Sequence, residues 1–81
     1  MAASLTLDRL EPGAPAIVAG FGQDHDGLLA KLREIGFAEG DEVELLTRGW
    51  LGGSPLCVRL NRTLIALRRG EARLIVVEPR R

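Results

Sequence analysis

The sequence has few of the residues that build cross-links, metal centres or membrane spans. Its 81 residues include one cysteine, one histidine, one tryptophan, two phenylalanines and no tyrosine. A single thiol cannot form an internal disulfide, and one cysteine with one histidine falls short of the roughly four ligands of a structural zinc site. No hydrophobic run approaches the roughly 18 residues of a membrane span, and the first residues lack the basic start and long apolar core of a signal peptide. We therefore expect a cytoplasmic protein that holds no cofactor and does not insert into the membrane.

The length limits how large a core the protein can build. We expect residues 1–81 to form one domain, and a chain of this size buries only a little more than about 60% of its unfolded surface. Hydrophobic residues make up 46% of the sequence and charged residues 27%, which favours a folded chain over a disordered one. A thin core predicts marginal stability or a partner, and weak association between copies of the chain is compatible with this.

The formal net charge is zero, which counts against a nucleic-acid-binding protein. The charge is unevenly distributed, however. The sequence up to Leu46 holds three basic and nine acidic residues, whereas the sequence from Thr47 onward holds eight basic and two acidic residues. The simpler interpretation is that strands from the two halves pair and their charges interleave. The alternative is a basic patch for an acidic protein partner.

One short amphipathic α-helix is predicted near residues 26–35. Leu28, Leu32 and Ile35 recur at helical spacing, and Leu29 widens the apolar stripe. We expect Leu32 and Ile35 to lie in the core, whereas Leu28 and Leu29, near the helix start, are where exposure is expected.

Both ends of this helix carry termination signals. Asp24 or Asp26 can accept the free backbone N–H groups of the first turn, and Asp26 is the preferred cap. Gly36 suits the left-handed position after the helix, and the next residue, Phe37, can then pack back onto Leu32.

The rest of the chain reads as short strands separated by turns. Strands are predicted at residues 14–21, from 41 onward, and at 56–60, 63–67 and 74–77. Gly20 and Gly22 suggest a bulge or bend, Asn61 suits a tight hairpin, and residues 68–72 allow one helical turn. Residues 48–55 hold three glycines and a proline and are predicted to form a loop. About five short strands with one inserted helix favour a mainly β fold, a small SH3-like antiparallel barrel.

Few residues are candidates for metal binding or catalysis. Asp24, His25 and Asp26 are weak candidates for a metal site, but three adjacent residues on one loop supply at most about two ligands, so capping of the helix is the better interpretation. Cys57 lies in an apolar strand and reads as a small core residue rather than a nucleophile. No acid–base pair, nucleophile motif or nucleotide-binding loop is present, so we expect no enzyme activity and no catalytic residues.

Trp50 and Leu51 stand out because they are large apolar residues between glycines. Aromatic residues of this kind are enriched at the centres of protein interfaces. The alternative is that Trp50 folds back over the end of the barrel.

Several short segments together resemble a known pattern. They are Leu7 and Leu10 before Pro12-Gly13, LREIGF at 32–37, GDEV at 40–43, the loop 52–55, IALR at 65–68, Glu71-Ala72, and IVV at 75–77. In order and spacing they resemble the FeoA family of bacterial ferrous iron transport. The resemblance implies an SH3-like barrel that acts by contact with the cytoplasmic region of the FeoB membrane transporter, and at the membrane's inner face only through that partner.

The sequence thus leads to one main functional hypothesis and two alternatives. The main hypothesis is a non-catalytic regulatory module that binds the transporter through Leu28, Leu29, Trp50 and Leu51. The alternatives are a small barrel that binds nucleic acid through its arginines and a barrel that binds proline-rich peptides. Zero net charge counts against the first alternative, and the small number of aromatic residues counts against the second.

Overall fold

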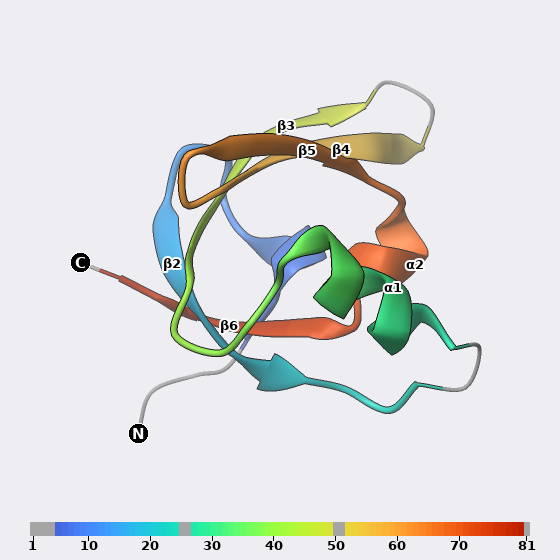
Figure 1. The fold of residues 1–81 in the computed structure, drawn as a ribbon. Helices are drawn as coiled ribbons and strands as arrows, with labels where there is room; N and C mark the ends of the chain where they lie inside the picture. The colour runs from blue at the N-terminus through green and yellow to red at the C-terminus, as the bar shows by residue number, and fades with distance from the viewer. Residues whose placement is uncertain (1–4, 25–26, 50–51, 81) are drawn as a thin grey trace.

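The computed structural model describes residues 5–24, 27–49 and 52–80. Its strands form one antiparallel sheet of six strands in the order β1-β6-β2-β3-β4-β5, which curls into a small barrel (Figure 1). The elements are β1 (Leu5–Thr6), the 3-10 helix η1 (Leu7–Arg9), β2 (Pro15–Phe21), α1 (Leu28–Ile35), β3 (Glu42–Gly49), β4 (Gly53–Leu60), β5 (Thr63–Leu67), α2 (Arg69–Ala72) and β6 (Ile75–Pro79). The predicted mainly β fold with one inserted helix is confirmed.

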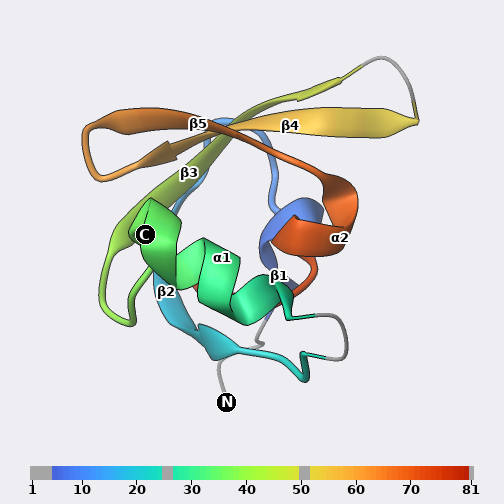
Figure 2. The ribbon, with the colours of Figure 1, turned by 45° about the vertical axis from the view of Figure 1, so that its right-hand side comes forward.

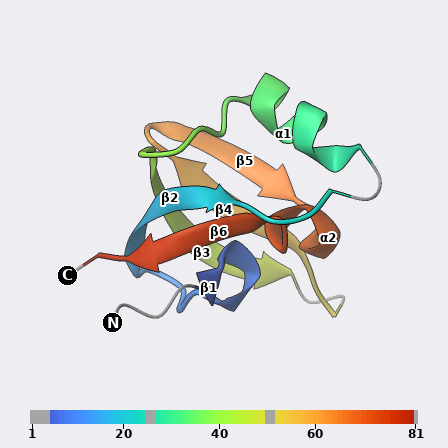
Figure 3. The ribbon, with the colours of Figure 1, turned by 90° about the horizontal axis from the view of Figure 1, so that it is seen from below.

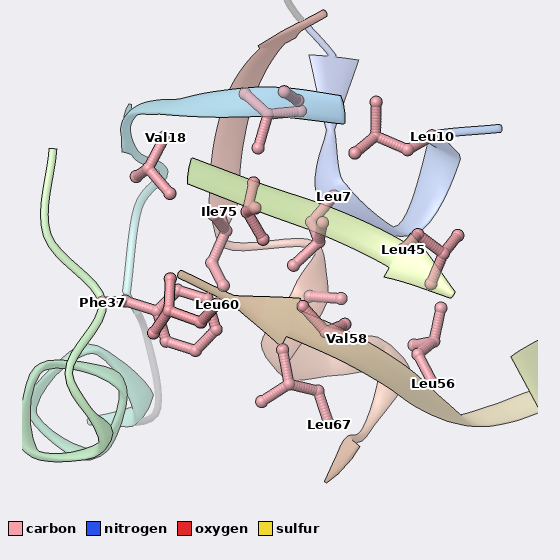
Figure 4. Close-up of a cluster of buried hydrophobic side chains, with 14 of the residues drawn as sticks. Leu7, Leu10, Val18, Phe37, Leu45, Leu56, Val58, Leu60, Leu67 and Ile75 are labelled. Carbon is pink, nitrogen blue, oxygen red and sulfur yellow. The ribbon is translucent and has the colours of Figure 1, made fainter. Parts of the chain in front are cut away.

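The core fills the inside of the barrel with aliphatic side chains and one phenylalanine (Figure 4). Alternation along β4 shows how the sequence produces it, because Leu56, Val58 and Leu60 are buried while Arg59 is exposed. The buried hydrophobic residues are Leu7, Leu10, Ala16, Val18, Leu32, Phe37, Val43, Leu45, Leu56, Val58, Leu60, Leu67, Ala72, Ile75 and Val77.

A sixth strand was missing from the prediction of about five. Leu5 and Thr6 form β1, which pairs with Val77 and Val76 of β6 before the chain turns into η1. Two residues are too short to show the alternation that identifies a strand in a sequence. The strand exists because β6 offers a free edge beside it.

The prediction of a loop at residues 48–55 is wrong. β3 continues to Gly49 and β4 begins at Gly53, and these two glycines pair across the hairpin. A Cβ atom on Gly49 would lie 2.3 Å from the carbonyl oxygen of Ser54, so only glycine allows this approach of the two strands. The glycines that suggested an irregular loop therefore permit a hairpin. Trp50 and Leu51 lie outside the described residues.

Other predicted turns and bends are confirmed. Asn61 adopts a φ of 54° in the two-residue turn that joins Leu60 to Thr63. The register of β2 with β6 shifts between Val18 and Gly20, which is the expected bulge.

Helix α1 ends as predicted, and one of its two predicted caps is observed. The N–H groups of Gly36 and Phe37 both donate to the carbonyl oxygen of Leu32, and Phe37 is buried. At the start, the carboxylate of Asp24 accepts the N–H groups of Leu28 at 2.8 Å and Leu29 at 3.0 Å. Asp24, one of the two predicted caps, therefore caps α1, and the preferred Asp26 lies outside the described residues. Gly27, with a φ of 74°, turns the chain so that Asp24 can reach back.

The inner face of α1 is narrower than its sequence predicts. Leu32 is fully buried, but Ile35 remains 37% exposed, so its predicted place in the core is wrong. Leu28 and Leu29 are half-buried. The helix lies across the open side of the barrel rather than inside it, so only its central leucine reaches the core (Figure 2).

Part of the uneven charge distribution is balanced by pairing between the two halves of the sequence, as the simpler interpretation expected. Each of the four ion pairs among the described residues joins one residue before Thr47 to one after it. They are Lys31–Glu71, Arg59–Glu44 at 3.3 Å, Arg73–Asp8 at 3.9 Å and Arg80–Glu42 at 2.5 Å.

Candidate protein-binding site

The short helix α2 lies between α1 and the end of the β3–β4 hairpin, and it contacts both (Figures 2 and 3). Glu71 of α2 accepts a hydrogen bond from the Lys31 ammonium of α1. Arg69 of α2 donates through Nη1 to the carbonyl oxygen of Gly52 in the hairpin at 3.0 Å. Side-chain contacts therefore link α1, α2 and the hairpin end along one side of the molecule, which we call the α2 face.

Glu71 is the one charged side chain that is buried among the described residues. Both of its carboxylate oxygens accept a hydrogen bond. One oxygen accepts the N–H of Arg68 at 2.8 Å, which caps α2, and the other accepts Lys31. Burial by itself raises the pKa of this carboxyl, but the hydrogen bonds from Lys31 and Arg68 and the nearby positive charges outweigh it, and the pKa lies below its usual value. Glu71 is therefore ionised at neutral pH and holds α1 against α2.

Of the four residues predicted to bind a partner, the structure describes two, Leu28 and Leu29. Leu28 and Leu29 begin α1, where both are half-buried. Trp50 and Leu51 are not described, but their neighbours Gly49 and Gly52 lie at the hairpin end on the other side of α2. The start of α1 and the hairpin residues Gly49 and Gly52 thus lie on either side of α2.

The α2 face carries two arginines whose charges are not paired. Arg68 and Arg69 are exposed and form no ion pair with a described residue, whereas Lys31 pairs with Glu71 and Arg73 pairs with Asp8. The sequence showed an excess of arginine after Thr47 but not where the arginines lie. Arg68 and Arg69 lie at the start of α2, which follows β5 directly.

The structure offers little support for a metal centre. Both carboxylate oxygens of Asp24 accept backbone N–H groups of α1, which confirms the capping interpretation for that residue. His25 and Asp26 lie outside the described residues. Within residues 5–24, 27–49 and 52–80 there is no group of three or more histidine, cysteine or acidic side chains that could hold a metal ion.

A cavity of about 170 Å³ lies beside the start of β3. Two ion pairs line it, Arg59–Glu44 and Arg80–Glu42. Because the charges neutralise one another in pairs, the cavity has no excess charge with which to bind an ionic ligand.

Two further side chains differ from what the sequence suggested. Cys57 is half-buried rather than a core residue, because β4 directs its neighbours Leu56 and Val58 inward and Cys57 toward the outer face. Leu64 in β5 is 63% exposed, and sequence reasoning did not select it. The alternation of side chains along a strand could have predicted this exposure. Leu67 points inward, and Leu64, three residues earlier, therefore points to the opposite face.

Neither helix of the described chain is long and apolar enough to cross a membrane. Residues 5–79 match the FeoA domain, and the barrel defines the chain as a small SH3-like protein. The chain belongs to the FeoA family.

Solved structures agree with this assignment. The iron(II) transport protein A of Clostridium thermocellum is 36% identical with a TM-score of 0.82, over 93% of this chain and 45% of that one. The FeoA of Stenotrophomonas maltophilia, complexed with zinc and described as a prokaryotic SH3 domain protein, is 37% identical with a TM-score of 0.76, over 90% of this chain and 88% of that one. The chain thus spans less than half of the first relative but most of the second.

A manganese-dependent transcriptional repressor has a TM-score of 0.85 over 99% of this chain and 44% of the repressor. At 21% identity this similarity shows the fold alone. No curated protein matches the sequence.

Proposed function

We propose that this chain is a non-catalytic accessory protein that binds the cytoplasmic region of a FeoB-type ferrous iron transporter through the α2 face. The observation that carries this proposal is the FeoA match over residues 5–79. The site is proposed from three features: the half-buried Leu28 and Leu29, the exposed Arg68 and Arg69 at the start of α2, and the position of Trp50 and Leu51 in the sequence between Gly49 and Gly52 of the hairpin.

The proposed contact combines apolar and electrostatic contributions. Aromatic and apolar side chains at the centre of an interface supply most of the binding energy, and arginines at the rim steer an acidic partner and make the association sensitive to salt. A partner surface rich in aspartate and glutamate would complement Arg68 and Arg69.

The experiment is a titration of the purified cytoplasmic region of the transporter with the chain and its variants. We expect Trp50→Ala and the double variant Leu28→Ala/Leu29→Ala each to weaken binding about tenfold or more, as truncation at an interface centre does. The double variant requires a check of folding by circular dichroism because both leucines are half-buried.

The matched control is Leu46→Ala, which truncates a half-buried leucine in β3 rather than on the α2 face. Its affinity should equal that of the wild type. Binding that is unchanged in all the variants would place the interface elsewhere, and a wild-type chain that does not bind would refute the proposed function.

A further inference from the structure

We propose that the free edge of β5 is a strand-addition site for an extended, apolar segment flanked by acidic residues. The sheet order places β5 at one end, paired only with β4 among the described residues. An edge strand presents backbone N–H and C=O groups that another strand can bind. This inference rests on the proposed function for the source of the segment, which is the partner bound at the α2 face.

The register of the hairpin shows which backbone groups are available. Leu60 and Thr63 close the two-residue turn, and such a closing pair exchanges both of its hydrogen bonds. Hydrogen-bonded pairs alternate with non-hydrogen-bonded pairs along an antiparallel ladder, so the next residues of β5 that hydrogen-bond β4 are Ile65 and Leu67. The intervening residues, Leu64 and Ala66, therefore direct their N–H and C=O groups away from β4.

The two edges of the sheet differ in how they are protected. Natural proteins protect edge strands by shortness, charge, proline or bulges. The edge strand β1 has only two residues, but β5 has five, pairs with β4 without a register shift, and holds no charged residue or proline. Its outward side chain Leu64 is 63% exposed, and Ala66 beside it is exposed as well.

The charges at the two ends of β5 indicate which kind of segment would bind along its free edge. Arg62 directly precedes the strand and Arg68 directly follows it, and both are exposed. Neither forms an ion pair with any described residue. A second copy of β5 would bring arginines together in either strand direction, which like-charge repulsion disfavours. A segment with Glu or Asp on both sides of an apolar centre would match the edge.

The location of β5 fits this role. Its last residue, Leu67, is followed by Arg68 and then by α2, so a strand added to β5 would end at the α2 face. Figure 3 shows α2 at the end of β5. One partner could therefore contact both sites.

The first experiment uses a synthetic probe, the acetylated and amidated peptide EEVTVTVEE, with KKVTVTVKK as its control. Residue-specific amide hydrogen exchange of the full chain is measured by NMR. We expect the acidic peptide to slow exchange at Leu64 and Ala66 and to leave Ile65, which already bonds β4, unchanged. The lysine-flanked peptide should bind at least tenfold more weakly. No protection at Leu64 and Ala66, or equal affinity for the two peptides, would overturn the inference.

Variants test the same edge in two ways. Ala66→Pro removes an N–H that faces away from β4 and should weaken binding of the acidic peptide at least tenfold. The double variant Arg62→Glu/Arg68→Glu keeps the backbone intact and should reverse the preference toward the lysine-flanked peptide, so the inference stays testable if the proline variant fails to fold. Unchanged peptide preference in the double variant would contradict the inference.

The same variants separate this inference from the proposed function. If the transporter region binds the wild type and the folded Ala66→Pro variant equally, the strand-addition site is overturned and the proposed function stands. If the peptide protects β5 but the transporter region does not bind, the proposed function fails and the site stands. A dimer in sedimentation experiments that Ala66→Pro abolishes would assign the edge to a second copy and overturn the inference.

Discussion

The ammonium of Lys31 on α1 donates a hydrogen bond to the buried carboxylate of Glu71 on α2, 40 residues further along the chain. The Glu71 side chain is 6% exposed, whereas that of Lys31 is 56% exposed. The backbone hydrogen bonds at the end of α1 return to its own Leu32 and do not link the helix to α2. This ion pair, together with the packing of Leu32 and Phe37, therefore fixes the inserted helix on the barrel.

Removal of the lysine should destabilise the protein more than its exposure suggests. Lys31→Met leaves the Glu71 carboxylate buried with a single remaining donor, the N–H of Arg68, and we expect a loss of about 1–3 kcal/mol in the free energy of unfolding. Urea unfolding followed by circular dichroism measures it. Glu34→Met, an exposed position on the same helix, is the control and should change stability by less than about 0.5 kcal/mol. Equal effects of the two variants would show that the ion pair does not stabilise the fold.

The lowered pKa of Glu71 predicts a specific dependence of stability on pH. A carboxyl whose folded pKa lies below its unfolded value of about 4.3 contributes stability that is complete above that value and is lost as the pH falls through the folded pKa. We expect the stability difference between the wild type and Glu71→Gln to be constant from about pH 7 to about pH 5 and to shrink toward about pH 3. Urea unfolding across this range measures it, and a difference that grew on acidification would contradict the assigned direction.

The cap of α1 can be tested at one residue. Asp24→Ala removes the acceptor of two backbone N–H groups and should cost about 0.5–2 kcal/mol of unfolding free energy, whereas Asp24→Asn, which keeps one acceptor oxygen, should cost less. Thermal unfolding measures both changes. Similar losses for the two substitutions would indicate that the negative charge at the helix start, rather than the hydrogen bonds, is what matters.

The narrow inner face of α1 predicts unequal effects of two similar truncations. Leu32→Ala removes a fully buried side chain and should cost about 2–5 kcal/mol, whereas Ile35→Ala should cost less than about 1 kcal/mol. Denaturant unfolding of the two variants measures the difference. Comparable losses would mean that Ile35 packs into the core in solution.

Gly49 should not tolerate a side chain. The Cβ atom of Gly49→Ala would meet the Ser54 backbone at 2.3 Å, so the hairpin would have to shift, at a cost of about 1–3 kcal/mol or more. Gly70→Ala is the control, because a Cβ atom there meets nothing within 4 Å and alanine favours the helix α2. Thermal unfolding of both variants provides the test, and a neutral Gly49→Ala would refute the close approach.

Local signals in the sequence determined several elements. Gly36 and Phe37 defined the end of α1, and Asn61 defined the turn between β4 and β5, because each depends on the backbone preferences of a few adjacent residues. The family resemblance, confirmed over residues 5–79, also came from the sequence. A stripe of leucines was enough to predict α1 but not how deeply each leucine is buried.

Only the tertiary structure decided which distant groups meet. The strand β1 forms because β6 lies beside it, and Gly49 is accommodated in a hairpin because Ser54 approaches it. The buried Glu71 gave no local signal, since its burial and its partner depend on α1 lying against α2. The free edge of β5 likewise follows from the order of strands in the sheet, which no single segment encodes. Backbone preferences of a few adjacent residues can thus be predicted from the sequence. Burial, charge pairing and exposed strand edges depend on contacts between distant segments, which form only when the barrel closes.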